Sequence, residues 1–229
     1  MKKIIFTSLL IASLIFLVSC SNPDQAYKET MEGKVYHAQD RWLFFQEGGD
    51  GLLIQIEDPK LDSGSRVKVQ TSGGVHGSYP SKFTDDYRLS LIKKAPDYLA
   101  FYENLMEEIW RKDPALNEDV ETLYYDFEGL TSLGENERKW LAEEFATRHK
   151  LKSEAISLDL LFEDESKIDK ETVSIKNGIH IRLNDSVKMG KLVTEYNKFS
   201  SGMGAIGGEV ETIFKNGKWT SEQIMETIS

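Results

Sequence analysis

Short runs in which apolar and polar residues alternate fill the chain from Thr30 to about Lys93. Five of them have the composition of β-strands, with aliphatic and aromatic residues at every second position or in short blocks. These runs lie at residues 35–37, 41–46, 52–56, 66–70 and 87–92. Gly48-Gly49-Asp50-Gly51, between the second and third, is typical of a turn. Five short strands in about 65 residues predict an oligonucleotide/oligosaccharide-binding (OB)-like β-barrel over residues 30–94.

Lys94-Ala95-Pro96 marks a boundary, after which the period of the apolar residues changes from two to about 3.6. Residues 97–112 predict an amphipathic helix that Pro114 ends, and a second helix is expected to begin at residues 131–135. Residues 120–127, between these helices, predict a strand, and residues 156–162 predict a short helical piece.

The remaining part predicts a β-meander followed by a short helix. Its four strands are expected at residues 172–176, 178–183, 188–199 and 208–214. Asn216-Gly217 is typical of a tight hairpin turn, and Ser221 to Ile228 is expected to form a short helix. Helices followed by antiparallel strands make an α+β domain over residues 96–229. The chain as a whole is therefore expected to be α+β, a small N-terminal OB-like β-barrel followed by an α+β domain with an antiparallel sheet.

A short positive segment, an apolar run and a cysteine follow one another at the start of the chain. Met1-Lys2-Lys3 precedes an apolar run over residues 4–18, which is shorter than the roughly 20 apolar residues that span a bilayer. Leu17-Val18-Ser19-Cys20 resembles the bacterial lipobox, in which a small residue before the cut gives the peptidase access to the backbone. We predict a lipoprotein signal peptide over residues 1–19, acylation of Cys20 and a polar tether over residues 20–29. The alternative is an uncleaved anchor with a chance cysteine.

The cysteine count and the charge fit an anchored protein. Cys20 is the only cysteine, so it has no partner for an internal disulfide, and acylation accounts for it. The formal net charge is -10, and removing residues 1–19, with Lys2 and Lys3, leaves 26 basic against 38 acidic residues, a net charge of -12. Nucleic acid and anionic membranes repel such a chain. We therefore expect no nucleic-acid partner, and attachment to the extracytoplasmic face of the cell membrane through the N-terminal lipid.

Two parts of the chain resemble known bacterial sequences. Gly74-Val75-His76-Gly77-Ser78-Tyr79-Pro80 resembles the ESYP segment of a small OB-type domain in an uncharacterised, YobA-like family of Firmicute lipoproteins, with Gly77 where an acidic residue is expected. Ser201-Gly202-Met203-Gly204-Ala205 and Asn216-Gly217-Lys218-Trp219 resemble uncharacterised domains of Firmicute surface proteins. Neither has an established activity, so the resemblance implies only the fold and the location.

Few motifs of known chemistry are present. Residues 202–207 match G-x-G-x-x-G, but dinucleotide binding needs a following helix, and residues 208–214 alternate like a strand. A glycine-rich bend between strands is the simpler interpretation. No H-E-x-x-H motif occurs, and we expect no metal site and no cofactor. The chain has four histidines, His37, His76, His149 and His180, and no metal-binding or catalytic motif contains them.

The leading functional hypothesis is a non-enzymatic binding module that contacts an envelope protein or a small ligand. Loops of OB barrels often bind ligands and aromatic residues supply much of the contact energy, which makes Trp42, His76 and Tyr79 the candidate patch. The alternative place for the two aromatics is the barrel core. The alternative function is an envelope hydrolase with an unrecognised carboxylate or histidine site, whose carboxylates should converge in a cleft.

Overall fold

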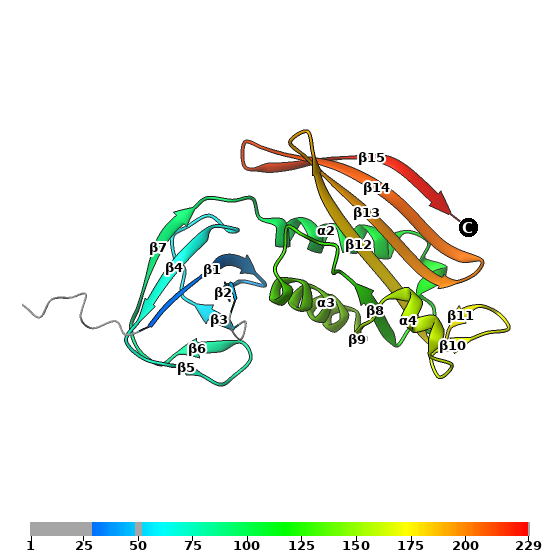
Figure 1. Ribbon diagram of the computed structural model, residues 1–229, viewed down its shortest axis with the longest axis horizontal. Helices are drawn as coiled ribbons and strands as arrows, with labels where there is room; N and C mark the ends of the chain where they lie inside the picture. Colours follow the sequence, from blue (N-terminus) through cyan, green and yellow to red (C-terminus); the bar gives the residue numbers. More distant parts are fainter. Residues whose placement is uncertain (1–28, 49–51, 229) are drawn as a thin grey trace, which may run out of the picture.

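The computed structural model describes residues 29–48 and 52–228, which form two β-sheets and three α-helices. The predicted signal peptide, Cys20 and nearly all of the tether lie outside the described residues. Figure 1 shows the first sheet at the left of the molecule and the second sheet at the right. The prediction of an α+β fold is confirmed. The strands of the first sheet are β1 (Glu29–Ala38), β2 (Arg41–Gln46), β3 (Leu53–Ile56), β4 (Arg66–Thr71), β5 (Val75–His76), β6 (Ser81–Phe83) and β7 (Tyr87–Lys93).

The first sheet is curled, because the chain joins two of its far strands over a short distance. The strand order is β5-β6-β3-β2-β1-β4-β7, so β6 and β7 have four strands between them. A flat sheet would hold these two roughly 24 Å apart, whereas the chain from Phe83 to Tyr87 spans at most about 14 Å. The ring centroids of Phe83 and Tyr87 are 4.6 Å apart. Within the described residues, no hydrogen-bonded strand pair closes the sheet.

Alternate residues of these strands form a small core inside the curl. The period-two pattern of residues 66–70 places Val67 and Val69 inside and their polar neighbours outside, as a strand with one buried face requires. The fully or nearly buried members of this core are Met31, Val35, Phe44, Ile54, Ile56, Val67 and Val69.

The second sheet contains both parallel and antiparallel strands. β8 runs parallel to β9 and to β12, while β12 to β15 form an antiparallel meander. The predicted antiparallel sheet is confirmed for the meander and wrong for β8 and β9, because a crossover helix connects these two strands and returns the chain in the same direction. The strands are β8 (Thr122–Asp126), β9 (Lys152–Ala155), β10 (Ile168–Asp169), β11 (Ser174–Ile175), β12 (Gly178–Lys188), β13 (Lys191–Ser201), β14 (Gly204–Lys215) and β15 (Lys218–Ile228).

The α-helices lie where the sequence predicts them, but the C-terminal segment is a strand and not the predicted helix. The helices are α2 (Tyr98–Arg111), α3 (Glu135–His149) and α4 (Leu158–Glu163), with a 3₁₀ turn η3 (Pro114–Asn117) after α2. Ser221 to Ile228, expected as a helix, belongs to β15 and pairs with β14. The turn at Asn216-Gly217 folds the chain back onto β14, and this pairing outweighs the helix propensity of the segment.

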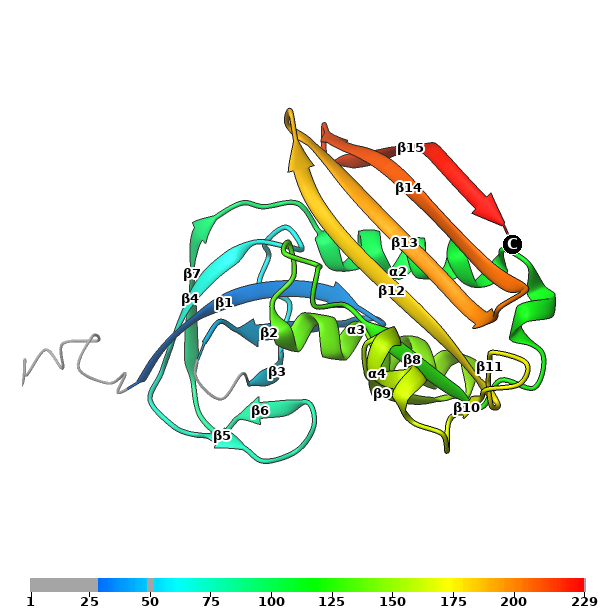
Figure 2. The same ribbon diagram turned by 45° about the vertical axis from the view of Figure 1, so that its right-hand side comes forward.

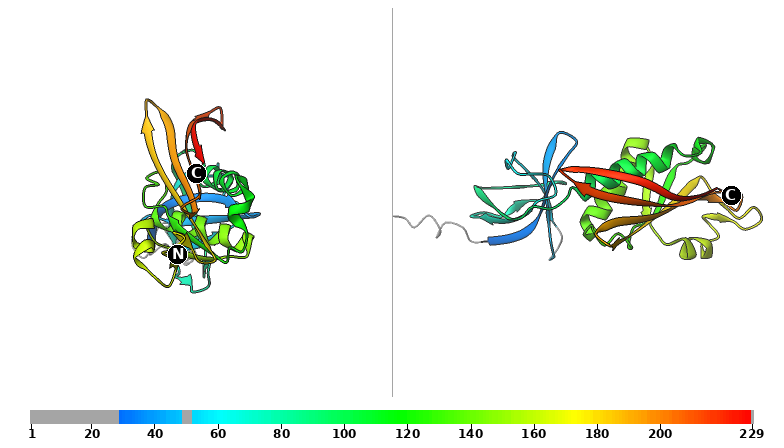
Figure 3. Two further views of the ribbon diagram at one scale, coloured as in Figure 1. Left: turned by 90° about the vertical axis from the view of Figure 1, so that its right-hand side faces the viewer. Right: turned by 90° about the horizontal axis from the view of Figure 1, so that it is seen from above.

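α2 and α3 connect the two sheets into one packed body. A single hydrophobic cluster combines Tyr36 and Phe45 of the first sheet with Tyr102 of α2, Trp140 of α3 and Leu123 of β8. The rings of Phe45 and Trp140 meet edge to face at 6.0 Å. Figures 2 and 3 show these helices beside the second sheet, with α3 also next to the ends of β1 and β2.

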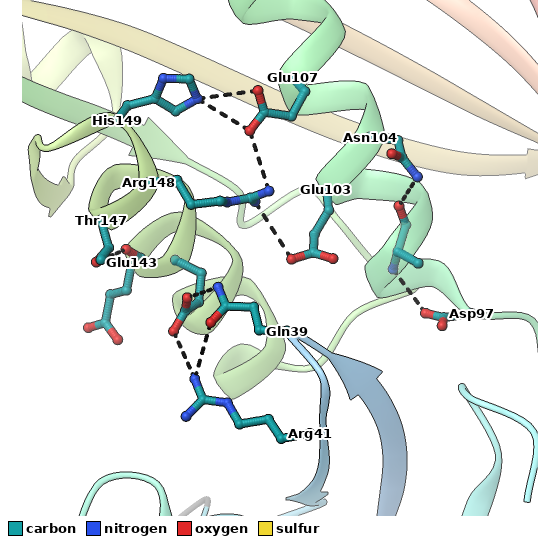
Figure 4. Close-up of polar contacts among 12 residues, drawn as sticks. Gln39, Arg41, Asp97, Glu103, Asn104, Glu107, Glu143, Thr147, Arg148 and His149 are labelled. Carbon is teal, nitrogen blue, oxygen red and sulfur yellow. Dashed lines mark hydrogen bonds and ion pairs between the residues drawn. The ribbon is translucent and has the colours of Figure 1, made fainter.

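Carboxylates on α3 reach back to the first sheet. The buried Glu137 accepts a hydrogen bond from Lys34 Nζ at 3.0 Å. Glu144 accepts a hydrogen bond from Gln39 and pairs with Arg41 at 3.5 Å. Figure 4 shows Gln39 and Arg41 pointing toward α3 from the turn between β1 and β2. The end of the β1–β2 hairpin is therefore fastened to this helix.

Candidate functional site

A pocket of about 880 Å³ opens where β8 and β9 end and where α3 and α4 begin. β8, α3 and β9 form a strand-helix-strand unit with parallel strands. In open α/β sheets, ligands bind in the crevice outside the carboxyl ends of such strands. The position of this pocket in the fold therefore makes it the candidate binding site.

Apolar side chains line part of the pocket. The rings of Tyr125 and Phe127, at and just beyond the end of β8, lie 5.1 Å apart. Burial, with the negative charge of Glu143, raises the pKa of Tyr125, so its phenol remains a neutral donor. The Ser157 side chain accepts a hydrogen bond from the Leu160 amide at 3.4 Å and begins α4. This cap leaves Leu160 at the pocket with 57% of its surface exposed, an apolar contact for a ligand.

The cations of the pocket have partners within the protein. One guanidinium nitrogen of Arg138 donates to the carbonyl oxygens of Glu128 and Leu130, each at 3.3 Å. Lys139 lies 3.8 Å from Glu143, one turn further along α3. The carboxylate side chains of Glu128 and Glu135 make no ion pair among the described residues. The charge available to a ligand at this rim is therefore mainly negative.

The loop between β8 and α3, which forms one wall, is held by Asp185 of β12. The Oδ1 atom accepts hydrogen bonds from the Thr131 amide at 2.8 Å and hydroxyl at 2.6 Å. The Oδ2 atom accepts from the Ser132 amide at 3.2 Å, the Ser132 hydroxyl and the Tyr102 hydroxyl at 2.6 Å. Burial alone would raise the pKa of Asp185, but these donors outweigh it and hold the pKa below its usual value.

The same loop approaches β12 closely at Gly129. A Cβ atom there would lie 1.9 Å from the Asn184 side-chain amide, and the Gly129 carbonyl accepts a hydrogen bond from the Asp185 amide at 2.9 Å. A larger residue here would have to displace the Asn184 side chain. The pocket wall is thus positioned before any ligand binds.

The three residues of the predicted patch lie in separate surroundings. Trp42 is partly buried against the core of the curled sheet, and its ring lies 5.2 Å from that of His37. His76 is exposed on β5, opposite Lys82. Tyr79 is 67% exposed, and its hydroxyl donates to Glu143 of α3 at 3.1 Å. None of these contacts connects Trp42, His76 and Tyr79 with one another, and the patch stays a prediction.

The imidazole rings of the histidines contact no serine or threonine hydroxyl among the described residues. Nε2 of His149 lies 3.2 Å from Glu107, where α3 meets α2, as Figure 4 shows. His180 is fully buried, and its Nε2 lies 3.1 Å from the Ile156 carbonyl oxygen. Burial lowers the pKa of His180 and favours the neutral ring, with Nε2 as the donor. No hydroxyl nucleophile of the described chain is paired with a histidine base in the way hydrolases require.

The glycine-rich motif is a bend between strands, as the simpler interpretation predicts. Residues 202–203 form the turn between β13 and β14, and a strand follows instead of a helix. A Cβ atom at Gly208 would lie 2.5 Å from the Tyr196 hydroxyl, so this glycine permits close packing. Among the described residues no group of three or more His, Cys, Asp or Glu side chains could hold a metal ion. In the same part of the chain, no helix has the length and apolar character needed to cross a membrane.

Comparison with known proteins gives no matching family model, no matching curated protein and no matching solved structure.

The pocket residues were missed by the sequence patterns, although one signal for them exists. β9, Lys-Ser-Glu-Ala at residues 152–155, is short and mostly polar, so it has no strand periodicity. One pattern could have predicted a parallel crossover between two strands. It is a strand at 122–126, then a helix at 135–149, then the helix cap Ser157.

Proposed function

We propose that this chain is a lipoprotein of the bacterial cell envelope, anchored through Cys20, that binds an envelope protein or a small ligand in the pocket at the ends of β8 and β9 without catalysing a reaction. The observation that carries the proposal is the pocket itself. Its wall is fixed by four hydrogen bonds from Thr131 and Ser132 to Asp185, and its lining combines Tyr125, Phe127 and the exposed Leu160 with unpaired carboxylates. Preformed concave sites of this kind suit binding.

We infer that the curled sheet is an OB-type barrel that serves mainly as a scaffold. The strand pairing supports this. β1 pairs with both β2 and β4, and β6 runs parallel to β3. The chain continues from β6 into β7, which pairs with β4. An OB fold is a five-stranded, partly open Greek-key barrel, in which β6 and β7 together would be the last strand. The same proposal includes the boundaries of the two units, 30–94 and 96–229. It also includes kinship with YobA-like lipoproteins.

The face that OB barrels commonly use for binding is covered in this protein by its own helix. Ligands of OB barrels contact the loop between the first two strands and the loop between the last two. Here Gln39 of the first loop contacts Glu144, and Tyr79 of the second contacts Glu143, both on α3. Phe45 of β2 packs on Trp140 of the same helix. We therefore place the primary site in the pocket and regard Trp42, His76 and Tyr79 as a secondary candidate patch.

Photo-crosslinking in intact cells tests the proposal. A photoreactive amino acid replaces Leu160, which is exposed at the pocket, and in a matched control it replaces Lys150, which is exposed at the other end of α3. We expect a discrete adduct from position 160 that is absent from position 150 and is lost when Tyr125→Ala alters the pocket. Identical adducts from both positions, or none from position 160, would contradict binding at this pocket.

A further inference from the structure

Two β-hairpins of the second sheet end side by side at one edge of the molecule. β12 and β13 turn at Met189-Gly190, and β14 and β15 turn at Asn216-Gly217. β13 and β14 are neighbours, and Leu192 opposite Thr212 is their last pair before both hairpins continue to their turns. Figures 1 and 2 show the two turns at the same end of the sheet. We call residues 187–191 and 213–218 the hairpin tips.

The first tip contains a residue that the turn disfavours. Both central residues of each turn have positive φ, 51° and 77° for Met189-Gly190 and 54° and 74° for Asn216-Gly217. Asn-Gly is the favoured pair for such a turn, whereas a bulky side chain is disfavoured at positive φ. Met189 is also completely exposed, and Val187 beside it is 70% exposed. An apolar residue in this position is costly in water, which points to contact with another surface.

Lysines lie in both hairpin tips beside these apolar side chains. Lys188, Lys215 and Lys218 are exposed and form no ion pair within the described chain, while Lys191 pairs with Glu211. No acidic residue occurs at positions 186–194 or 212–221. This is a local basic region in a protein whose formal net charge is -10.

The second tip is fastened to the body of the protein. The ring of Trp219 lies 4.8 Å from Phe214 and 5.0 Å from Phe101 of α2. Its indole nitrogen donates to the Asp97 carbonyl oxygen at 3.0 Å. The second tip therefore presents its lysines from a fixed position, and β14 joins it to the neighbouring strand β13 of the first tip.

We propose that the hairpin tips dock on the anionic surface of a phospholipid membrane, with Met189 and Val187 entering the interface and Lys188, Lys215 and Lys218 facing the phosphate groups. Apolar side chains ringed by lysines are the composition that binds at such an interface. The lysines complement an anionic surface, and the exposed Met189 and Val187 favour a lipid interface, which apolar side chains can enter, over the charged surface of a second copy of this chain. The contact goes beyond the pocket proposal, and it would orient an anchored protein on its membrane.

Vesicle co-sedimentation tests the tips independently of the lipid anchor. The probe is the chain of residues 20–229 with Cys20→Ser, which retains every residue of the hydrophobic clusters and cannot be acylated. We expect it to pellet at low salt with phosphatidylglycerol vesicles and not with phosphatidylcholine vesicles, despite its net charge. Salt should weaken the binding, because it screens exposed charges.

Two matched variants assign the binding to the tips. The triple variant Lys188→Gln, Lys215→Gln, Lys218→Gln should bind on the order of 100-fold more weakly, since each lysine near an anionic surface contributes about fivefold. The control Lys82→Gln, Lys150→Gln, Lys152→Gln removes the same charge from exposed positions elsewhere and should bind like the parent. Met189→Asn should also weaken binding, although it improves the turn. No pelleting of the parent, equal pelleting with neutral vesicles, an equal loss in the control, or tip-dependent capture of an acidic protein without vesicle binding would each overturn the proposal.

Discussion

Asp185 holds the loop that forms one wall of the candidate pocket, and the substitution Asp185→Asn tests how much these hydrogen bonds stabilise the protein. The oxygen of the new amide can still accept from Thr131, but its NH₂ group then faces the Ser132 amide, which can only donate. The two hydroxyl donors, on Ser132 and Tyr102, must rotate to accept instead. The variant thus loses one backbone hydrogen bond at a half-buried site and the charge that strengthens the others. Together these losses should lower the free energy of unfolding by about 2–4 kcal/mol.

Urea unfolding at neutral pH measures this change, with Asp40→Asn as the control. Asp40 is exposed and has a φ of 59°, a conformation that asparagine also tolerates, so its replacement should change stability by less than about 0.5 kcal/mol. The pKa of Asp185 is lower in the folded protein than its usual value near 3.8. Its stabilising effect is therefore complete above that usual value and is lost as the pH falls through the lower, folded pKa. The stability difference between parent and variant should shrink on acidification. A variant as stable as the control at pH 7 would refute the role given to Asp185.

Other predictions follow from single contacts. Met189→Asn should raise the free energy of unfolding by about 0.5–1 kcal/mol in urea, because asparagine suits the positive φ of the turn; a loss would contradict the description of the turn. Glu137→Gln should cost about 1–3 kcal/mol, since it weakens the buried contacts with Lys34 and Tyr36; unchanged thermal unfolding would argue against them. Burial lowers the pKa of Lys198 to about 8. The folded protein therefore binds fewer protons than the unfolded chain above that pH, and stability should rise between about pH 8 and the unfolded pKa near 10.4. Lys198→Met should abolish this rise, and an equal rise in the variant would be evidence against it.

The features that sequence patterns predicted are those set by neighbours in the chain. The apolar stripe of α2 includes Leu99, Tyr102 and Ile109, which are buried as the helical period requires. The Asn216-Gly217 turn forms the expected hairpin. In both cases the local pattern and the tertiary contacts favour the same structure.

The features that were missed depend on residues far apart in the sequence. The segment after Ser221 has helix-forming residues, and only its pairing with β14 makes it a strand. β9 is a strand because β8 lies beside it, and without β9 the crossover and its pocket could not be predicted. Tyr79 contacts Glu143, which is 64 positions away, so its place against α3 was not visible in the loop sequence.

The proposed cleavage before Cys20 and attachment through it are tested most directly by mass spectrometry of the N-terminal peptide. The full-length protein is expressed in a bacterial host and digested after isolation of the membranes, with Cys20→Ala treated in parallel. We predict a peptide that begins at Cys20 and carries the mass of a diacylglyceryl group, with residues 1–19 absent. The Cys20→Ala protein should keep residues 1–19 and lack the lipid mass. A parent chain that retains residues 1–19 with an unmodified Cys20 thiol would contradict the proposed anchor.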